Sequence, residues 1–333
     1  MTTSPIPLGD PHLDATMGVE LRAIEDRLAR IARDGEPLIQ QAAEHLIAAG
    51  GKRLRPALVF LTAMLGADGI DDRVRQAALA TEVTHLATLY HDDVMDSAPL
   101  RRGAPSAHEV WGNQMAILTG DLLFARASQL VADLGPWAVR IQADAFERLV
   151  LGQMHETLGP RDGQDEIEHY LKVLSDKTGS LISAAARYGT YFSGASEQVQ
   201  QAAVTYGEKV GVAFQLADDV IDLSADAATT GKTPGTDLRE GVATMPVLLL
   251  RARGEELDPE GRAILQALER DLSDDDALAE VVARLREHPV VEDVRAQARR
   301  WADEAVAALE PLPETTARRA LEAFAGLLVD RLA

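Results

Sequence analysis

Two clusters of aspartates with the same spacing are the residues most able to do chemistry in this sequence. Each reads Asp-Asp-x-x-Asp, and their members are Asp92, Asp93, Asp96 and Asp218, Asp219, Asp222. In a helix the first and last aspartates of a cluster share a face one turn apart, and the middle one lies about 100° around. The flanking segments 86–90 and 210–216 are apolar, so two solvated helix faces explain the pattern poorly. Buried carboxylates need cations or metals to offset their lost hydration.

The ligands that these clusters offer are all oxygens, and the chain has no cysteine. Carboxylates without thiolates or paired histidines favour a hard cation, and Mg²⁺ is the best match. Mg²⁺ keeps several waters and prefers one or two carboxylates together with substrate phosphate. Two clusters that face each other therefore predict several Mg²⁺ ions that bridge a diphosphate between them.

Basic residues stand where such a diphosphate would need them, several of them in Gly-containing segments. The candidates are Lys52, Arg53, Arg55, Arg101, Arg102, Lys177 and Lys232. The chain has only five lysines, so the lysines among these positions suggest a need for a compact point charge. For any one of these bases alone, an ordinary surface cation is the alternative. The segment GKTPG is not a P-loop, because it lacks the upstream glycine spacing and the strand–helix context.

The charge balance narrows the class of protein. There are 53 acids and 33 bases, a formal net charge of −20, which argues against a nucleic-acid partner because phosphate backbones bind basic surfaces. It argues equally against docking on anionic lipid by charge. The absence of cysteine excludes disulfides, thiolate nucleophiles and cysteine-ligated zinc or iron–sulfur clusters. It leaves the compartment open, and a reducing cytoplasm is the default expectation.

Helices must position these residues, since helix-forming residues dominate the long segments and strand signals are scarce. The segment 76–91 is unusual because Glu82 is its only formal charge. Its apolar stripe is opposed by small and hydroxyl side chains rather than by charges. This pattern is typical of a helix buried on both sides, and it predicts one wall of an internal cavity. His85 lies two turns before Asp92 on the cavity side, although a lone helical histidine is more often structural.

No segment reads as a membrane span. The longest stretch without formal charge, 56–67, has 12 residues, whereas about 18–20 apolar residues are needed. Residues 1–14 are polar and contain proline, without an apolar signal core, so we expect a flexible N-terminal arm there. We expect residues 15–333 to form a single domain, because no interdomain linker is recognisable.

Taken together, the motifs resemble the trans-prenyl diphosphate synthases, also called polyprenyl synthetases. GGKRLRP, HDDVMD followed by RRG, KTGSL, FQLADDVID and GKTPGTDLREG occur in that family's order and with about its spacing across residues 48–250. The likeness is strongest to bacterial long-chain members that make menaquinone-type side chains. The C-terminal residues from about 254 carry no motif and are placed in the fold by position only.

The resemblance implies an all-α, single-domain bundle of about 10 to 13 helices around a deep central cavity, of the isoprenoid synthase type, and a homodimer. The substrates would be isopentenyl diphosphate and an allylic diphosphate, with about three Mg²⁺ ions per active site. Metal would be held by Asp92, Asp96 and Asp218, supported by Asp93, Asp219 and Asp222. The allylic substrate would contact Arg101, Lys177, Thr178, Gln215 and Lys232. Isopentenyl diphosphate would contact Lys52, Arg55, His85 and Arg102, and Gln153 matches a family position that faces the cavity. Catalysis would depend on Asp92, Asp93, Asp96, Asp218, Lys177 and Lys232.

The implied reaction begins when metal and bases stabilise the departing pyrophosphate, so that the allylic C1–O bond ionises. The isopentenyl double bond attacks the cation, and the released pyrophosphate takes up the proton. The tail then grows down the cavity beneath the first cluster, where this chain has Ala87, Thr88 and, deeper, Thr84. Short-chain members usually carry an aromatic ring at that level, so we expect a product beyond C20, in the range C30–C50.

Alternatives stay open at this stage. A shorter-chain synthase with C15–C20 products would share these motifs. A class I terpene cyclase shares the fold and the first cluster, but usually carries a mixed Asn/Ser/Glu motif at the second. A regulatory subunit of a heteromeric synthase tends to lose its aspartate motifs, and a generic acidic helical interaction protein would not need the phosphate-site bases.

Overall fold

The described part of the chain is almost wholly helical, as the composition predicts. The computed structural model describes residues 6–33, 36–224 and 234–330. The α-helices are α1 Pro11–Ala32, α2 Pro37–Ala48, α3 Leu54–Ala63, α4 Asp72–Met95, α5 Ala107–Trp111, α6 Asn113–Asp133, α7 Pro136–Leu158, α8 Glu166–Leu174, α9 Ser180–Phe192, α10 Glu197–Ser224, α12 Thr236–Arg239, α13 Met245–Ala252, α14 Pro259–Leu268, α15 Asp275–Glu287, α16 Val290–Ala307 and α17 Thr316–Asp330. Within the described residues they outnumber the ten to thirteen expected, because helices as short as α5 and α12 show no periodic pattern.

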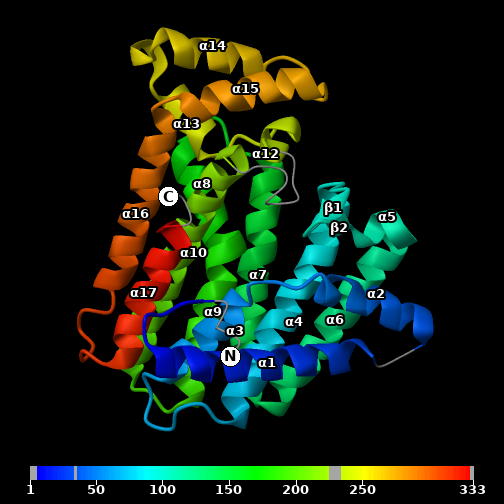
Figure 1. The fold of residues 1–333 in the computed structure, drawn as a ribbon, viewed down its shortest axis with the longest axis vertical. Helices are drawn as coiled ribbons and strands as arrows, with labels where there is room; N and C mark the ends of the chain where they lie inside the picture. The colour runs from blue at the N-terminus through cyan, green and yellow to red at the C-terminus, as the bar shows by residue number, and fades with distance from the viewer. Residues whose placement is uncertain (1–5, 34–35, 225–233, 331–333) are drawn as a thin grey trace.

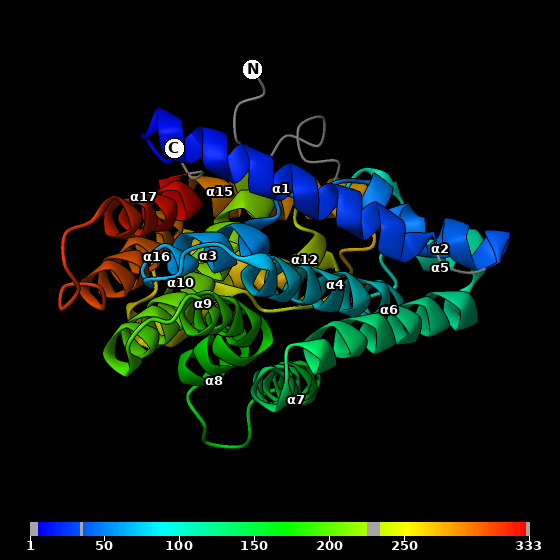
Figure 2. The same ribbon diagram turned by 90° about the horizontal axis from the view of Figure 1, so that it is seen from below.

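Figure 1 shows α14 and α15 across the upper end of the bundle and α1 across its lower part, whereas α4, α7, α10 and α16 run between these levels. Seen from below in Figure 2, α1 and α2 run along one side of the bundle and α7 and α8 lie on the opposite side. Between them, α4 packs against α3, α6 and α9, and α10 packs against α9 and α16. The two helices that carry the aspartate clusters are therefore in the interior of the fold.

Helix α4 is buried on both sides, as its charge-poor sequence predicts. Its hydroxyl face is buried together with its apolar stripe. Thr81 Oγ1 donates to the carbonyl of Ala77, and Thr84 Oγ1 donates to that of Ala80, each at 2.8 Å. Burial therefore leaves neither hydroxyl proton unpaired.

A flexible arm was expected over residues 1–14. Residues 6–14 differ from it, and residues 1–5 lie outside the described residues. Helix α1 begins at Pro11, and the side chain of Asp10 caps it by accepting hydrogen bonds from the amides of residues 12 and 13. Ile6 and Leu8 are buried in the main hydrophobic core. Two isolated apolar residues between prolines form no periodic pattern, so their tertiary burial is invisible in the sequence.

A short hairpin follows α4 and is the only strand pairing in the described ranges. Strand β1 (Leu100–Arg101) pairs antiparallel with β2 (Ala104–Pro105). The two turn residues, Arg102 and Gly103, have φ of 55° and 78°, as a tight two-residue hairpin turn requires. The hairpin holds Arg101 and Arg102 beside the C-terminal end of α4.

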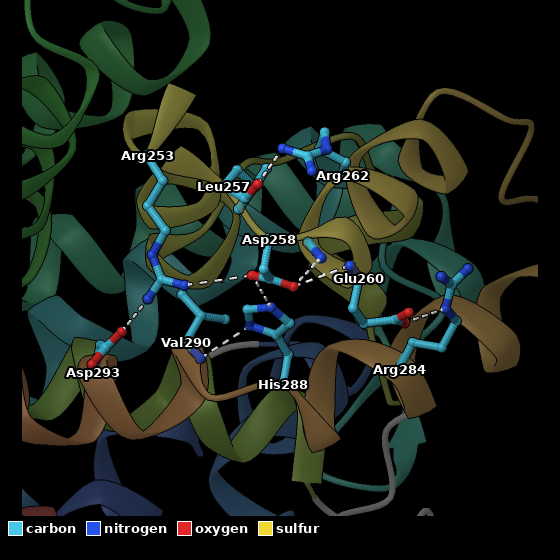
Figure 3. A network of polar contacts seen from close by, with 10 residues as sticks. Arg253, Leu257, Asp258, Glu260, Arg262, Arg284, His288, Val290 and Asp293 are labelled. Atoms are coloured by element: carbon cyan, nitrogen blue, oxygen red, sulfur yellow. Dashed lines mark hydrogen bonds and ion pairs between the residues drawn. The ribbon is translucent and has the colours of Figure 1, made fainter. Parts of the chain in front are cut away.

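The C-terminal helices, for which the sequence shows no motif, are tied together by a polar network (Figure 3). Asp258 is its centre: its carboxylate caps α14 at the Gly261 amide (3.0 Å) and accepts from His288 Nε2 (3.0 Å). The Nδ1 of His288 accepts from the Val290 amide at 3.1 Å, so the ring proton belongs on Nε2. Arg253 adds ion pairs to Asp258 and Asp293. These contacts link α13, α14, α15 and α16.

Helix α6 is the one helix of the described residues that is long and apolar enough to cross a membrane by length and composition. It contains Asp121 and Arg126, and it packs along α4 and against α2, α5 and α7. These contacts are those of a helix in a globular bundle.

Candidate active site

The two aspartate clusters lie at the C-terminal ends of α4 and α10, and all of their members except Asp93 line one cavity of about 730 Å³. Most of the predicted site residues also line it: Lys52, Arg55, His85, Thr88, Asp92, Asp96, Arg101, Arg102, Lys177, Thr178, Gln215, Asp218, Asp219 and Asp222. Segments far apart in the sequence thus bring carboxylates and bases to one hollow.

Nearby positive charge offsets the burial of Asp92 and Asp96 only in part. Asp96 is the C-cap of α4 and Asp92 lies one turn before it, where the carbonyl end of the helix carries negative partial charge. Burial raises the pKa of Asp92 to about 6, against the lowering effect of Lys177 and with added repulsion from Asp96. Burial also raises the pKa of Asp96. A bound cation would relieve both effects.

The second cluster divides into members with different surroundings. Asp219 is 6% exposed, and the Tyr170 hydroxyl lies 2.9 Å from both of its carboxylate oxygens. The Met245 amide donates to Asp219 Oδ2 at 3.1 Å, and burial raises the pKa of Asp219 well above its usual value. Asp219 therefore ties α8 and α13 to α10, while Asp218 and Asp222 lie on the same cavity wall. No motif points to Tyr170.

Asp93 is the member of the first cluster that does not line the cavity. Its side chain is fully buried, and its Oδ1 accepts from Arg101 Nε at 2.6 Å. Its Oδ2 is buried without a hydrogen-bond partner. Asp93 thus lies behind Arg101 and fixes its direction, which is a positioning role rather than direct contact with a diphosphate.

The donor set fits a hard divalent cation. Asp92, Asp96 and Asp218 present carboxylate oxygens to the cavity. Among the residues that the structure describes, no three acid or histidine side chains converge closely enough to hold an ion by themselves. This agrees with Mg²⁺, which completes its octahedron with water and substrate phosphate.

Cations gather on another part of the wall, where Lys52 is exposed and Arg55 and Arg102 are half-buried. Burial lowers the pKa of Arg55 despite the opposing effect of Glu82, and Arg102 lowers it further. Burial, and then Arg55 and Arg102, hold the pKa of His85 well below its usual value. His85 is therefore a neutral hydrogen-bonding group, and the crowded cations favour an anionic ligand.

Arg53 lies next to these cations, but its charge is paired with carboxylates of the protein and is not directed to a ligand. It is 4% exposed and has φ of 50° as the N-cap of α3. Its guanidinium donates to Glu82 at 2.9 Å and to both oxygens of Glu25 at 2.6 and 3.0 Å. This pairing explains why Glu82 is the one charge in segment 76–91, and it anchors the loop that presents Lys52 and Arg55.

Lys177 and Thr178 belong to a π-helical turn, η1 (Ser175–Gly179), between α8 and α9. Lys177 Nζ donates to Glu156 at 2.5 Å. Burial alone would lower the pKa of Lys177, but Glu156 and then Asp92 raise it above its usual value. A Cβ on Gly152 would lie 2.6 Å from the backbone nitrogen of Lys177. The absence of a side chain at Gly152 therefore lets α7 approach the π-helical turn. π-Helical turns of this kind frequently mark functional sites.

Gln153 lies outside the cavity. It lines an apolar groove of about 550 Å³ between α4, α6 and α7, called the lateral groove below. The groove shares Thr88, Asp92 and Leu149 with the cavity. Gln153 Oε1 is buried without a hydrogen-bond partner.

Two further predicted residues, Ala87 and Thr84, are not brought to the cavity. Ala87 is fully buried, and Thr84 is 3% exposed; neither lines the cavity or the lateral groove. Lys232 lies outside the described residues. Thr88 alone of the three predicted chain-length positions lines the cavity.

Comparison with known proteins points to one family. The sequence profile of the polyprenyl synthetases matches residues 36–285. A nonaprenyl diphosphate synthase of Mycobacterium tuberculosis is 44% identical over 328 residues, which are 98% of this chain and 96% of that protein. The resemblance seen in the motifs is thereby confirmed over nearly the whole chain.

Solved structures share the fold. A geranylgeranyl pyrophosphate synthase from Corynebacterium glutamicum, complexed with calcium and isoprenyl diphosphate, has a TM-score of 0.84 and 39% identity, covering 97% of this chain and 98% of that one. A decaprenyl diphosphate synthase from Rhodobacter capsulatus has a TM-score of 0.84 and 34% identity, covering 97% and 99%. The all-α prediction is confirmed, and this chain belongs to the polyprenyl synthetase family.

Proposed function

We propose that this protein is a long-chain trans-polyprenyl diphosphate synthase, which condenses isopentenyl diphosphate units one after another onto an allylic diphosphate primer. The observation that carries the proposal is the cavity itself. It combines two aspartate clusters at helix C-terminal ends with a separate group of cations. Two diphosphate sites account for this arrangement: one diphosphate would bind through metal ions held by the aspartates, and the other would bind directly to the cations.

On the allylic side, Lys177 and Arg101 bind the diphosphate next to Asp92 and Asp96. Mg²⁺, held by the first cluster and Asp218, would supply the positive charge that stabilises the departing pyrophosphate. Lys177 acts as a point charge that the π-helical turn aims into the cavity, and Arg101 is aimed by its buried carboxylate partner.

On the isopentenyl side, Lys52, Arg55 and Arg102 bind the second diphosphate, and neutral His85 offers a hydrogen bond without adding charge. Apolar residues complete the wall between the two sites: Leu149, Leu181, Phe214 and Ile221. Such a wall limits water near the allylic cation, and no protein base or nucleophile is needed because the released pyrophosphate can take the proton.

The long product is supported by the absence of an aromatic side chain on α4 one turn before Asp92, where this chain has Ala87 and Thr88. Relatives with nonaprenyl and decaprenyl in their names support it as well. A C15–C20 product is the alternative, since a geranylgeranyl synthase is also close in fold and sequence. A quinone side chain of the menaquinone type is the proposed destination, with the cytoplasm as the compartment.

We propose a homodimer built on the apolar faces of α6 and α7. Large apolar side chains lie exposed on these two neighbouring helices: Ile117, Leu118, Val150, Leu151, Met154 and Leu158. A contiguous exposed patch of this kind is typical of a protein interface. A second copy of the chain is the proposed partner, because its own α6 and α7 would bury the apolar faces of both helices in one interface.

The test is incubation of purified protein with labelled isopentenyl diphosphate, Mg²⁺ and C10, C15 or C20 allylic diphosphates, followed by chromatography of the dephosphorylated products. We expect a ladder that ends beyond C20. No extension of any primer would refute the proposed activity, and a ladder that ends at C15 or C20 would establish the shorter-chain alternative.

A further inference from the structure

Between α4 and α7, the cavity and the lateral groove meet and share part of their lining. Thr88 of α4 and Leu149 of α7 line the cavity and the lateral groove alike. No α7 residue before Phe146 lines either hollow. One turn further from the aspartates than Thr88 and Phe146, about 5.4 Å along each helix, the facing positions are Thr84 and Gln142.

A hydrogen bond crosses the space at that level. Gln142 Nε2 of α7 donates to Thr84 Oγ1 of α4 at 3.2 Å. Thr84 in turn donates to the carbonyl of Ala80 in its own helix. Gln142 is 9% exposed and Thr84 is 3% exposed, so a side-chain amide is buried where an apolar residue would avoid the cost of a polar group.

Two neighbours of Gln142 on α7 are small. Ala138 and Ala145 lie four residues before it and three residues after it, hence on the same face, and both are buried. Phe146, four residues after it, shares this face and lines the lateral groove. Among the buried residues of this face below Phe146, Gln142 is therefore the long side chain. Removing it would open space directly beneath Thr88, and enlarging it would fill that space.

We propose that Gln142 is a specificity-determining residue: with Thr84 it forms a gate that the growing polyprenyl tail must open to pass between α4 and α7. The inference rests on the proposed synthase activity. A tail that passes this level must replace the hydrogen bond between Gln142 and Thr84 with apolar contacts. Each growing polyprenyl chain that reaches the gate therefore either displaces the Gln142 side-chain amide or stops growing. The gate thus acts on product length and not on the first condensation, which takes place beside the aspartates.

The test measures product length and the first condensation separately for each variant. Gln142→Ala should shift the main product upward by at least one prenyl unit or remove intermediates that end at the gate, and Gln142→Phe should shift it downward by at least one unit. Thr84→Val, which keeps the shape but removes the acceptor, should shift it in the same direction as Gln142→Ala. Thr81→Val is the matched control, because the Thr81 hydroxyl donates within its own helix; its product should be unchanged.

The rate of the first condensation with a C10 primer, and the melting temperature, should stay within twofold and a few degrees of the wild type in every variant. If wild-type protein extends primers while Gln142→Ala and Gln142→Phe leave the product distribution unmoved, the gate is refuted and the synthase activity stands. If wild-type protein extends no primer, the proposed function itself fails.

Discussion

Replacing Glu82 by Gln should destabilise the protein markedly, because Glu82 pairs with a buried arginine. The side chains of Arg53 and Glu82 are each 2% exposed, and their charged atoms are 2.9 Å apart. Removing one partner of a buried ion pair costs about 3–5 kcal/mol of the free energy of unfolding, since the other charge is left without compensation. Glu25 remains in contact with Arg53, but its side chain is 43% exposed, so it replaces little of the lost interaction.

The expected loss converts into a measurable change in melting temperature. An unfolding entropy of about 2.1 cal/mol/K per residue gives roughly 0.7 kcal/mol/K for a chain of 333 residues. A loss of about 3–5 kcal/mol therefore lowers Tm by about 4–7 °C. Calorimetry and urea unfolding of the Glu82→Gln variant measure it. The isopentenyl diphosphate KM should also rise, because Arg53 anchors the loop that carries Lys52 and Arg55.

Glu25→Gln is the matched control, since it removes a carboxylate from the same arginine at the surface. Its expected cost is about 1 kcal/mol or less, as for exposed ion pairs. Equal losses in the two variants, or a loss below about 1 kcal/mol for Glu82→Gln, would contradict the reasoning that burial decides the strength of this pair.

Three further predictions concern the metal site, the π-helical turn and the interface. Asp218→Asn should lower turnover by about 100-fold or more and weaken Mg²⁺-dependent pyrophosphate binding in calorimetry, with an unchanged fold by circular dichroism; near-normal binding and turnover would place the metal elsewhere. Gly152→Ala should weaken pyrophosphate binding and lower the free energy of unfolding by about 1–3 kcal/mol, because the added Cβ would lie 2.6 Å from the backbone of the π-helical turn. Gly326→Ala is the control and should have neither effect, because the nearest atom to its Cβ is 3.8 Å away. Similar melting curves for the two variants would show that the turn moves to accommodate the methyl group. Leu118→Asp should separate the dimer and so halve the molecular mass measured by analytical ultracentrifugation. Val19→Asp, at a similarly exposed position on α1, should leave that mass unchanged. A Leu118→Asp variant that remains dimeric would show that α6 does not form the interface.

The sequence allowed the fold class and the position of the aspartate clusters to be predicted, because both depend on local periodicity. The charge-poor stretch 76–91 identified a buried helix, and the spacing placed Asp92 and Asp96 on one face of it. Periodicity could not reveal partners that are distant along the chain. That Asp93 faces Arg101 depends on a hairpin with two positive φ angles, for which the sequence showed no strand signal.

Other features of the site depend on packing between helices. Tyr170 is 49 residues from Asp219 in the chain, and nothing in its own segment marks it as a partner. Ala87 was expected to meet the tail because it lies one turn from the aspartates. The structure buries it instead, close to Gly120 on α6, where a Cβ would lie 3.1 Å from the Ala87 carbonyl oxygen. The spacing in the sequence correctly placed Ala87 one turn from the aspartates along the helix axis. Whether its side chain faces the cavity or a neighbouring helix depends on which helix packs against that face.

The π-helical turn at Ser175–Gly179 makes this part of the chain sensitive to a change in its length. A π-helical turn accommodates one residue more than an α-helical turn does, so deletion of a single residue there would let α8 and α9 merge into one continuous α-helix. Because the wider turn absorbs the extra residue, α8 and α9 would keep the faces they present, whereas the residues within the turn would change direction. Lys177 would leave Glu156 and the first aspartate cluster, although no charged residue had been removed. Its position in the site thus depends on the number of residues in the turn as much as on their identity.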